Sequence, residues 1–265
     1  MKAYCINLDS RPDRLAHMEA QAGRAGLVFE RLPAVDAADP EVAAAAARLA
    51  PSPRGLPISA GAYGCFQSHR EAWRRLLASE AAHAIVLEDD VILAPGAGEW
   101  QAPGWIPEDA GLVRLETSGR RLHLEDARSG PGRRQLARLR SQDYGTGAYA
   151  VSAAAAAALL AATETFSEPV DDLLFSERPP LPEGLAVYQV VPAPAVQGKR
   201  AHLVGASAEG SEWAESSIPE RHQAGSGGAA RGPAPEGRAA RLSRRLREEL
   251  RARRLGTRYV VVPHG

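Results

Sequence analysis

Three consecutive carboxylates follow a short apolar run in this chain and restrict where that run can lie in a fold. Residues 84–87 read Ala-Ile-Val-Leu, and Glu88, Asp89 and Asp90 come directly after them. Four apolar residues that end at charged ones predict a short buried strand. An unpaired buried carboxylate is costly, so the three cannot lie inside a sheet. They must lie at the edge of the sheet, where α/β proteins bind ligands.

The spacing of these carboxylates indicates a metal site. Glu88 and Asp90 are two residues apart, so their side chains point to the same side of a strand while that of Asp89 points to the other. Convergent carboxylates are the hard oxygen ligands that Mg²⁺ and Mn²⁺ prefer. We therefore predict a divalent metal bound by Glu88 and Asp90, with Asp90 as the leading direct ligand. The alternative is a solvated acidic loop, which the apolar residues 91–93 make the weaker interpretation.

Apolar patterning predicts strands that alternate with helices. The expected strands are residues 3–8, 28–32, 84–87, 111–115, 145–151 and 185–191, and the expected helices begin near residues 12, 41, 64 and 153. This alternation is typical of an α/β fold with a mixed, largely parallel sheet flanked by helices. Ser10 and Ser152 are the expected N-caps of the first and last of these helices. The basic, polar segment 119–141 is expected to be a solvent-facing excursion.

The character of the chain changes after residue 205, so we expect the folded domain to comprise residues 1–205. Residues 206–237 are an expected linker rich in Gly, Ala, Pro and Ser. Residues 238–265 are an expected basic tail, with nine arginines against two glutamates between Arg238 and Arg258. Its leucines follow a helical spacing, and a basic amphipathic helix can lie on anionic lipid headgroups. A helix packed on its own domain is the alternative.

Composition narrows the class of protein. The chain has 265 residues, of which 45% are hydrophobic, and a formal net charge of zero, so we expect a globular protein without a nucleic-acid partner. We find neither the apolar core of a signal peptide nor a stretch near the ~20 apolar residues that span a bilayer. We therefore expect a cytoplasmic protein. Cys5 and Cys65 have the surroundings of ordinary buried thiols.

Six motifs in order resemble one family. They are Ile6–Arg14 (INLDSRPDR), Gly61–His69 (GAYGCFQSH), Ala84–Asp90 (AIVLEDD), Gly145–Tyr149 (GTGAY), Pro169–Asp171 (PVD), and Val187–Pro192 (VYQVVP) leading to Gln197. Together they resemble glycosyltransferase family 25, the lipooligosaccharide and lipopolysaccharide glycosyltransferases, to which the collagen galactosyltransferases are related. Two features depart from the family pattern. Gln67 replaces the usual aliphatic residue, and the tail matches no family segment.

The resemblance implies a GT-A-like, Rossmann-like fold and an inverting transfer of a hexose from a UDP-sugar, usually UDP-galactose. The implied acceptor is a saccharide of lipooligosaccharide, lipopolysaccharide or another cell-envelope glycan, so the basic tail is expected to contact the inner membrane surface peripherally. Glu88, Asp89 and Asp90 would correspond to the DxD motif of GT-A enzymes, with Mn²⁺ or Mg²⁺ as cofactor. Glu88 or Asp89 can instead hydrogen-bond the ribose hydroxyls of the donor.

The turn after the first strand is the expected nucleotide contact. Asn7, Arg11 and Arg14 lie beside a helix N-terminus, where guanidinium groups and the helix dipole favour phosphate. The alternative for the arginines is an ion pair with Asp9 or Asp13.

Two histidines are further candidates. His69, in the Ser-His pair of the second motif, is expected near the donor, with a packing role as the alternative. His202 is a candidate late metal ligand, with an exposed loop histidine as the alternative.

Inversion by direct attack needs one general base for the acceptor hydroxyl. Asp171 is the leading candidate, and Glu116, at the end of the 111–115 strand, is the other. Asp171 can instead cap the helix that follows it.

Two other functions compete with the transferase. A non-catalytic nucleotide-sugar-binding relative would keep the carboxylates but lose the base. A Mg²⁺-dependent phosphohydrolase would need a nucleophilic Asp on the first strand, whereas Asp9 lies in a turn.

Overall fold

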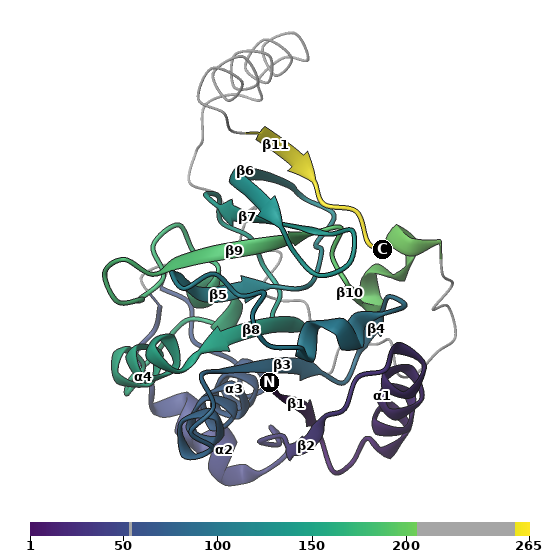
Figure 1. Cartoon of the computed structure of the whole chain (residues 1–265). Helices are drawn as coiled ribbons and strands as arrows, with labels where there is room; N and C mark the ends of the chain where they lie inside the picture. Colours follow the sequence, from purple (N-terminus) through teal and green to yellow (C-terminus); the bar gives the residue numbers. More distant parts are fainter. Residues whose placement is uncertain (53–54, 206–257) are drawn as a thin grey trace, which may run out of the picture.

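A computed structural model of the chain describes residues 1–52, 55–205 and 258–265 (Figure 1). Its centre is a nine-stranded sheet in the order β11-β6-β7-β9-β5-β8-β3-β1-β2, and β4 and β10 form a second, two-stranded sheet. The strands are β1 (Lys2–Asn7), β2 (Glu30–Pro33), β3 (His83–Glu88), β4 (Val91–Leu93), β5 (Ala110–Arg114), β6 (Arg121–Ser129), β7 (Gln135–Leu139), β8 (Ala148–Ser152), β9 (Ala186–Val191), β10 (Ala195–Gln197) and β11 (Arg258–Val261).

The sheet is mixed, but most of its strands run the same way. β1 pairs in parallel with β2 and β3, and β5 pairs in parallel with β9. β8 is antiparallel to both β3 and β5, and β7 is antiparallel to β9 and β6. Strands β2, β1, β3, β5, β9 and β6 therefore share one direction, and β8, β7 and β11 oppose it. The expected largely parallel α/β sheet is confirmed.

Helices cover both faces of this sheet (Figure 1). They are α1 (Pro12–Ala25), α2 (Pro40–Arg48), α3 (Ala60–Ala78), α4 (Ala153–Ala162) and α5 (Val170–Leu174), with 3₁₀ segments η1 (Ala97–Gln101) and η2 (Gly198–Val204). Alternate residues of a strand face opposite sides, so Cys5 of β1 packs with Met18 of α1, whereas Tyr4 packs with Phe66 of α3. No described helix is long and apolar enough to cross a bilayer.

Helix α3 is held close to the loop after β2, and this approach positions the residues that it shares with the site. Ser59 is its N-cap and accepts a hydrogen bond from the backbone N–H of Ala62. A Cβ on Gly64 would lie 2.5 Å from the carbonyl oxygen of Val35, so only glycine permits this contact. Ser68 Oγ then accepts from the Val35 N–H at 2.8 Å.

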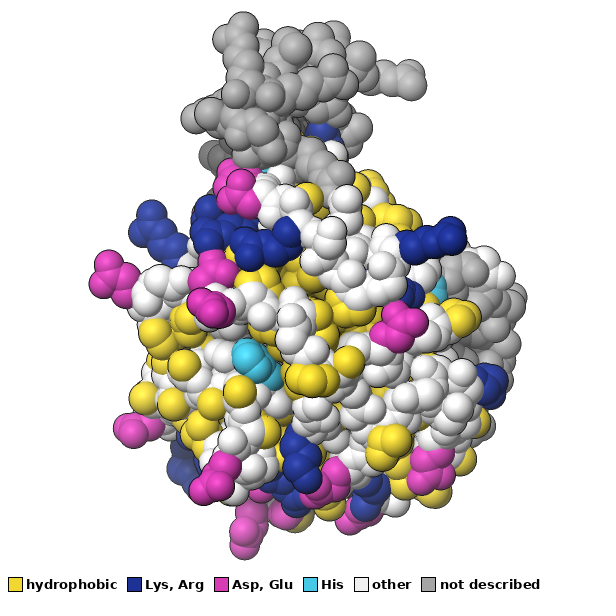
Figure 2. Space-filling view, in the orientation of Figure 1, with side chains coloured by type: hydrophobic (Ala, Val, Ile, Leu, Met, Phe, Trp, Pro, Cys, Tyr) yellow, Lys and Arg dark blue, Asp and Glu magenta, His cyan; other side chains and the backbone are white. Residues whose placement is uncertain are grey.

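Two local expectations from the sequence are wrong. Ser10 does not cap α1, because Arg11 occupies the N-cap position without a side-chain cap and Pro12 begins the helix. Segment 119–141 is not a solvent-facing excursion, because most of it forms β6 and β7. Leu122 and Leu124 are buried and alternate with polar residues, and this two-residue period is that of a strand. On the face in Figure 2, side chains of both signs lie interspersed.

The end of the chain belongs to the main sheet. β11 pairs antiparallel with β6, and the Thr117 hydroxyl donates to the Val262 carbonyl oxygen at 2.6 Å. This strand was not expected from the sequence, which places residues 258–265 in the basic tail. The expected linker 206–237 and tail residues 238–257 lie outside the described residues.

Candidate functional site

A cavity of about 320 Å³ lies at the edge where β1 and β3 end. Ligand sites for small molecules commonly have this size, and in α/β sheets they occur at the carboxyl ends of strands. Its walls come from four parts of the chain. They include Asn7 and Arg14, residues 34–38 after β2, Cys65, Ser68 and His69 of α3, and Glu88, Asp89 and Asp90.

Asp89 anchors the start of α1 to the end of β3. The Asn7 side-chain amide donates to Asp89 Oδ2 at 2.8 Å, and Arg14 Nη1 donates to Oδ1 at 3.0 Å. Burial raises the pKa of Asp89, while Arg14 and Asn7 oppose the rise. Asn7 and Arg14 therefore line the cavity, and both are bonded to a carboxylate there, while their contact with a nucleotide stays a prediction.

The two other arginines of this region, Arg11 and Arg31, pair with the carboxylates of Asp13 and Asp9, which do not line the cavity. Arg11 makes two hydrogen bonds to Asp13, of 2.9 and 2.7 Å, and does not line the cavity. Arg31, which sequence reasoning missed, donates to Asn7 Oδ1 at 2.9 Å and also bonds Asp9. No local pattern marks Arg31, because its partners come from another strand.

Glu88 accepts three hydrogen bonds. Thr146 Oγ1 donates to Oε1 at 2.6 Å, Gln197 Nε2 donates to Oε2 at 3.1 Å, and His69 Nε2 lies 3.3 Å from Oε1. Burial disfavours the charge of Glu88, but the hydrogen bonds from His69 and Thr146 outweigh it and lower the pKa of the carboxyl. Glu88 is therefore a carboxylate at neutral pH.

The pKa of Asp90 is shifted in the opposite direction, upward. Burial, and next the charge of Glu88, raise the pKa of Asp90, while the Lys199 ammonium on η2 opposes the rise. Asp90 Oδ1 is buried and has no hydrogen-bond partner among the described residues. An unpaired oxygen beside a second carboxylate fits a divalent cation, and a metal bound by Glu88 and Asp90 stays a prediction.

A second set of donor atoms lies in the same wall. One ligand atom each from Cys65, His69 and Glu88 lies within 4.8 Å of the others. The sequence did not predict this set, because Cys65 and Glu88 are 23 positions apart and meet only through the packing of α3 on β3.

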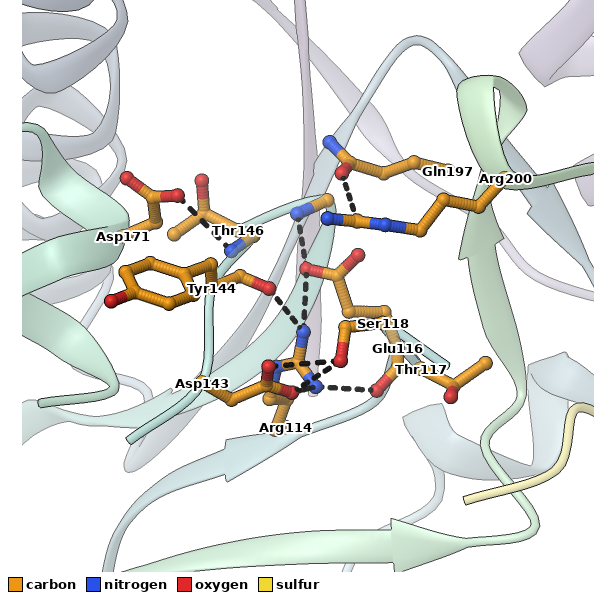
Figure 3. A network of polar contacts seen from close by, with 12 residues as sticks. Arg114, Glu116, Thr117, Ser118, Asp143, Tyr144, Thr146, Asp171, Gln197 and Arg200 are labelled. Atoms are coloured by element: carbon orange, nitrogen blue, oxygen red, sulfur yellow. Dashed lines mark hydrogen bonds and ion pairs between the residues drawn. The ribbon is translucent and has the colours of Figure 1, made fainter. Parts of the chain in front are cut away.

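Three consecutive residues before β8 each bond one carboxylate, and Figure 3 shows two of these carboxylates, Asp171 and Glu116. The Gly145 N–H donates to Asp171 Oδ2 at 3.2 Å, Thr146 bonds Glu88, and the Gly147 N–H donates to Glu116 Oε1 at 2.9 Å. Gly145 has a φ of 100°, and a Cβ there would lie 2.8 Å from Glu116 Oε1. The Gly-Thr-Gly motif thus joins both candidate bases to the predicted metal site.

Glu116 lies inside the protein beneath this motif. Its side chain is 0% exposed, and Arg114 Nη2 lies 3.6 Å from Oε1 (Figure 3). Arg114 also forms a buried ion pair with Asp143 and donates to the Tyr144 carbonyl oxygen at 2.6 Å. Burial raises the pKa of Glu116 to about 7 against the charges of Arg114 and Arg200. Glu116 Oε2 has no hydrogen-bond partner among the described residues.

Asp171 is partly exposed in the first turn of α5. Pro169 is the N-cap of that helix, so the alternative that Asp171 caps it is wrong. Asp171 Oδ1 accepts from the Asp172 N–H at 3.1 Å, and the negative charge of Asp171 contributes to the raised pKa of Cys65 in the cavity wall. His202 is exposed on η2.

Comparison with known proteins decides the family. A sequence profile described as glycosyltransferase family 25 (LPS biosynthesis protein) matches residues 1–174, which is more than half of the chain. The chain belongs to glycosyltransferase family 25. The match extends from β1 to α5 and contains every site residue named above except those of β10 and η2. A member of a glycosyltransferase family implies a nucleotide-sugar donor and a saccharide acceptor.

Several similar proteins carry names from lipooligosaccharide biosynthesis. The lacto-N-neotetraose biosynthesis glycosyltransferase LgtB of Neisseria gonorrhoeae is 31% identical over 207 residues, which cover 73% of this chain and 73% of the relative. LgtE of the same organism is 30% identical over 208 residues, which cover 73% and 72%. The lipooligosaccharide biosynthesis protein lic2B of Haemophilus influenzae is 24% identical over 205 residues, which cover 73% and 75%.

Proposed function

We propose that this family member is an inverting glycosyltransferase that transfers a hexose, with galactose as the first candidate, from a UDP-sugar to a saccharide of lipooligosaccharide, lipopolysaccharide or another cell-envelope glycan. The observation that carries the proposal is the ionised Glu88 beside the unpaired Asp90 in the wall of a cavity of ligand size. The names of the LgtB, LgtE and lic2B relatives support the acceptor class.

Mn²⁺ or Mg²⁺ is the proposed cofactor, with Asp90 as the leading ligand and Glu88 as the second. Asp90 provides a buried oxygen that no described group bonds, and Glu88 keeps its negative charge through its hydrogen bonds. A divalent ion would stabilise the charge that develops on the diphosphate leaving group. Lys199 is exposed, and its charge acts on the pKa of both carboxylates, so it is a candidate cation for the same phosphates.

The cavity beside these carboxylates is the proposed binding site for the nucleoside of the donor. Asn7, Arg14, His69, Glu88 and Asp89 all line it. Because Asn7 and Arg14 already bond Asp89, we propose that they shape and charge this wall. The ribose hydroxyls remain a proposed partner for Glu88 or Asp89. Arg11 remains a proposed phosphate contact only if it leaves Asp13.

Asp171 is the proposed general base, since it is partly exposed and the Gly145 N–H orients its carboxylate toward the Gly-Thr-Gly motif (Figure 3). It would take the proton of the acceptor hydroxyl as that oxygen attacks the anomeric carbon. Glu116 is the second candidate, because its pKa of about 7 and its unpaired Oε2 suit a base at neutral pH. Its complete burial requires that the acceptor displace neighbouring groups to reach it.

The proposal includes a cytoplasmic location and a peripheral contact between the basic tail and the inner membrane surface. Nine arginines against two glutamates between Arg238 and Arg258 support the membrane contact.

The test is a panel of UDP-sugars with lipooligosaccharide-derived acceptors, assayed for product with Mn²⁺ or with EDTA. We expect transfer with one UDP-hexose, its loss with EDTA, and a fall of at least about 100-fold for Asp90→Asn. Asp126→Asn is the matched control, because Asp126 is exposed on β6 and Asn tolerates its positive φ.

Two results would replace the proposal. Tight UDP binding without transfer to any acceptor in the panel would indicate a non-catalytic relative. Release of phosphate from phosphomonoesters without donor selectivity would indicate a phosphohydrolase.

A further inference from the structure

Four side chains from three elements form a row that ends at Glu88. Trp73 Nε1 lies 2.9 Å from the Tyr149 hydroxyl oxygen, and this oxygen lies 2.9 Å from His69 Nδ1. His69 Nε2 then lies 3.3 Å from Glu88 Oε1. Trp73, Tyr149 and His69 are all 0% exposed, so water does not compete for these contacts.

Trp73 gives this row a direction. An indole N–H can only donate, so the Tyr149 oxygen accepts from Trp73. Burial raises the pKa of Tyr149 well above its usual value, so the phenol keeps its own hydrogen. Among the described residues, the only other partner recorded for this hydroxyl is His69 Nδ1. The phenol therefore donates to Nδ1, and the hydrogen of the neutral imidazole lies on Nε2.

The other neutral tautomer of His69, with its hydrogen on Nδ1, is unfavourable at both Tyr149 and Glu88. If Nδ1 carried the hydrogen, Tyr149 would accept twice and its own buried O–H would have no acceptor among the described residues. The unprotonated Nε2 would then face the Glu88 carboxylate, and two lone pairs would oppose each other at 3.3 Å. A doubly protonated ring would leave the same phenol hydrogen without an acceptor.

We propose that Trp73 and Tyr149 are positioning residues of the transferase, which hold His69 as its Nε2–H tautomer so that it donates to Glu88 and orients this carboxylate in the cavity wall. The role of this orientation in donor binding rests on the proposed function. The tautomer itself rests on the contacts and the burial of the row, and not on any ligand.

The tautomer also decides between the two sets of donor atoms in the wall. A ring nitrogen that carries hydrogen has no lone pair for a metal, so His69 Nε2 does not ligate one. The Cys65, His69 and Glu88 set is therefore no metal site through this nitrogen, although its ligand atoms lie within 4.8 Å of one another. The carboxylates of Glu88 and Asp90 therefore stay the proposed ligands of the cation.

Nitrogen NMR on the full-length protein with ¹⁵N-labelled histidine tests the tautomer directly. The chain has seven histidines, so the His69 signals are identified by their loss in His69→Gln. We expect a pyridine-type Nδ1 and a pyrrole-type Nε2 near neutral pH. A pyrrole-type Nδ1 in the wild-type protein would overturn the inference, whether or not any transferase activity is found.

Tyr149→Phe tests the positioning role, because it removes only the hydroxyl between Trp73 and His69. We expect a shift of the His69 signals toward a mixture of tautomers and a fall of about 10-fold in kcat/KM, the usual effect of losing a partner behind a site residue. Tyr188→Phe is the matched control, since the Tyr188 hydroxyl bonds Asp109 and Arg138 away from the row.

The two readouts separate the inference from the proposed function. An unchanged tautomer in Tyr149→Phe would overturn the positioning role. If Tyr149→Phe changes the tautomer but the wild-type protein neither binds UDP nor transfers sugar, the positioning of His69 by Tyr149 stands. The proposed function is then the part that is contradicted.

Discussion

Glu88 and Glu116 lie near the carboxyl ends of β3 and β5, on either side of β8, and their pKa values are shifted in opposite directions. Glu88 is 21% exposed, and its hydrogen bonds from His69 and Thr146, together with the charge of Lys199, lower its pKa. Glu116 is 0% exposed and, despite the nearby Arg114, has a pKa raised to about 7 by burial. The comparison shows that hydrogen bonds to the carboxylate, combined with a nearby positive charge, lower the pKa of Glu88 in spite of its burial, whereas the charges of Arg114 and Arg200 do not offset the complete burial of Glu116.

Arg114→Met should have the largest effect, and it acts on stability. It leaves Asp143 as a buried charge without its cation, and breaking a buried pair costs about 3–5 kcal/mol. Urea denaturation measures the loss. Arg114→Met combined with Asp143→Asn should recover part of it, whereas full stability in the single variant would show that Arg114 supports no buried charge.

Glu88→Gln should have the second largest effect, and it acts on transferase activity. Glutamine keeps the size of Glu88 but removes the charge that the proposed cation needs, so we expect transfer to fall about 100-fold. Glu116→Gln is the matched comparison. If Asp171 is the base, Glu116→Gln keeps most activity and Asp171→Asn loses it; the reverse result would assign the base to Glu116.

The pKa of Glu116 predicts a pH dependence of stability. Its folded-state pKa of about 7 lies above the ordinary glutamate value of 4.5 expected in the unfolded chain, so the folded state binds more protons between these pH values and stability falls as pH rises through them. Between pH 5 and 7.5 we expect the wild type to lose about 2–3 kcal/mol relative to Glu116→Gln. Parallel urea curves across this range would mean that Glu116 is already ionised at pH 5.

Thr146→Val should have a smaller effect. It removes one hydrogen bond to the Glu88 carboxylate while keeping the shape of the side chain, and a bond to a charged group contributes about 1.5–3 kcal/mol. We expect roughly a tenfold fall in kcat/KM, measured against Thr163→Val, whose hydroxyl bonds lie at the end of α4. Equal activity of the two variants would show that Glu88 does not depend on Thr146.

The elements that were predicted correctly from the sequence are those marked by a pattern of neighbouring residues. The run before Glu88 is a buried strand, and Ser152 caps α4 by accepting from the Ala155 N–H. It missed β6 and β7, because arginines surround Leu122 and Leu124 and make the segment read as polar. It also missed β11, whose partner lies more than a hundred residues earlier in the chain.

In the site, too, features set by neighbouring residues were predicted and contacts between distant residues were not. The positions of Glu88, Asp89 and Asp90 at the sheet edge were predicted from the requirement that charges avoid the core. The contacts that set their charges were not predicted, because Thr146 and Gln197 reach Glu88 from 58 and 109 positions away. The row from Trp73 through Tyr149 to His69 could not be predicted either, because β8 brings Tyr149 beside α3 only in the folded chain.

The central claim is that the carboxylates at the end of β3 bind a cation that secures a UDP-sugar. Titration calorimetry of UDP against the full-length protein, with Mn²⁺ or with EDTA, measures this directly in wild type and in Asp90→Asn. We expect wild-type affinity to fall at least about tenfold with EDTA, and the variant to bind weakly in both conditions. Equal affinity in all four measurements would contradict the account.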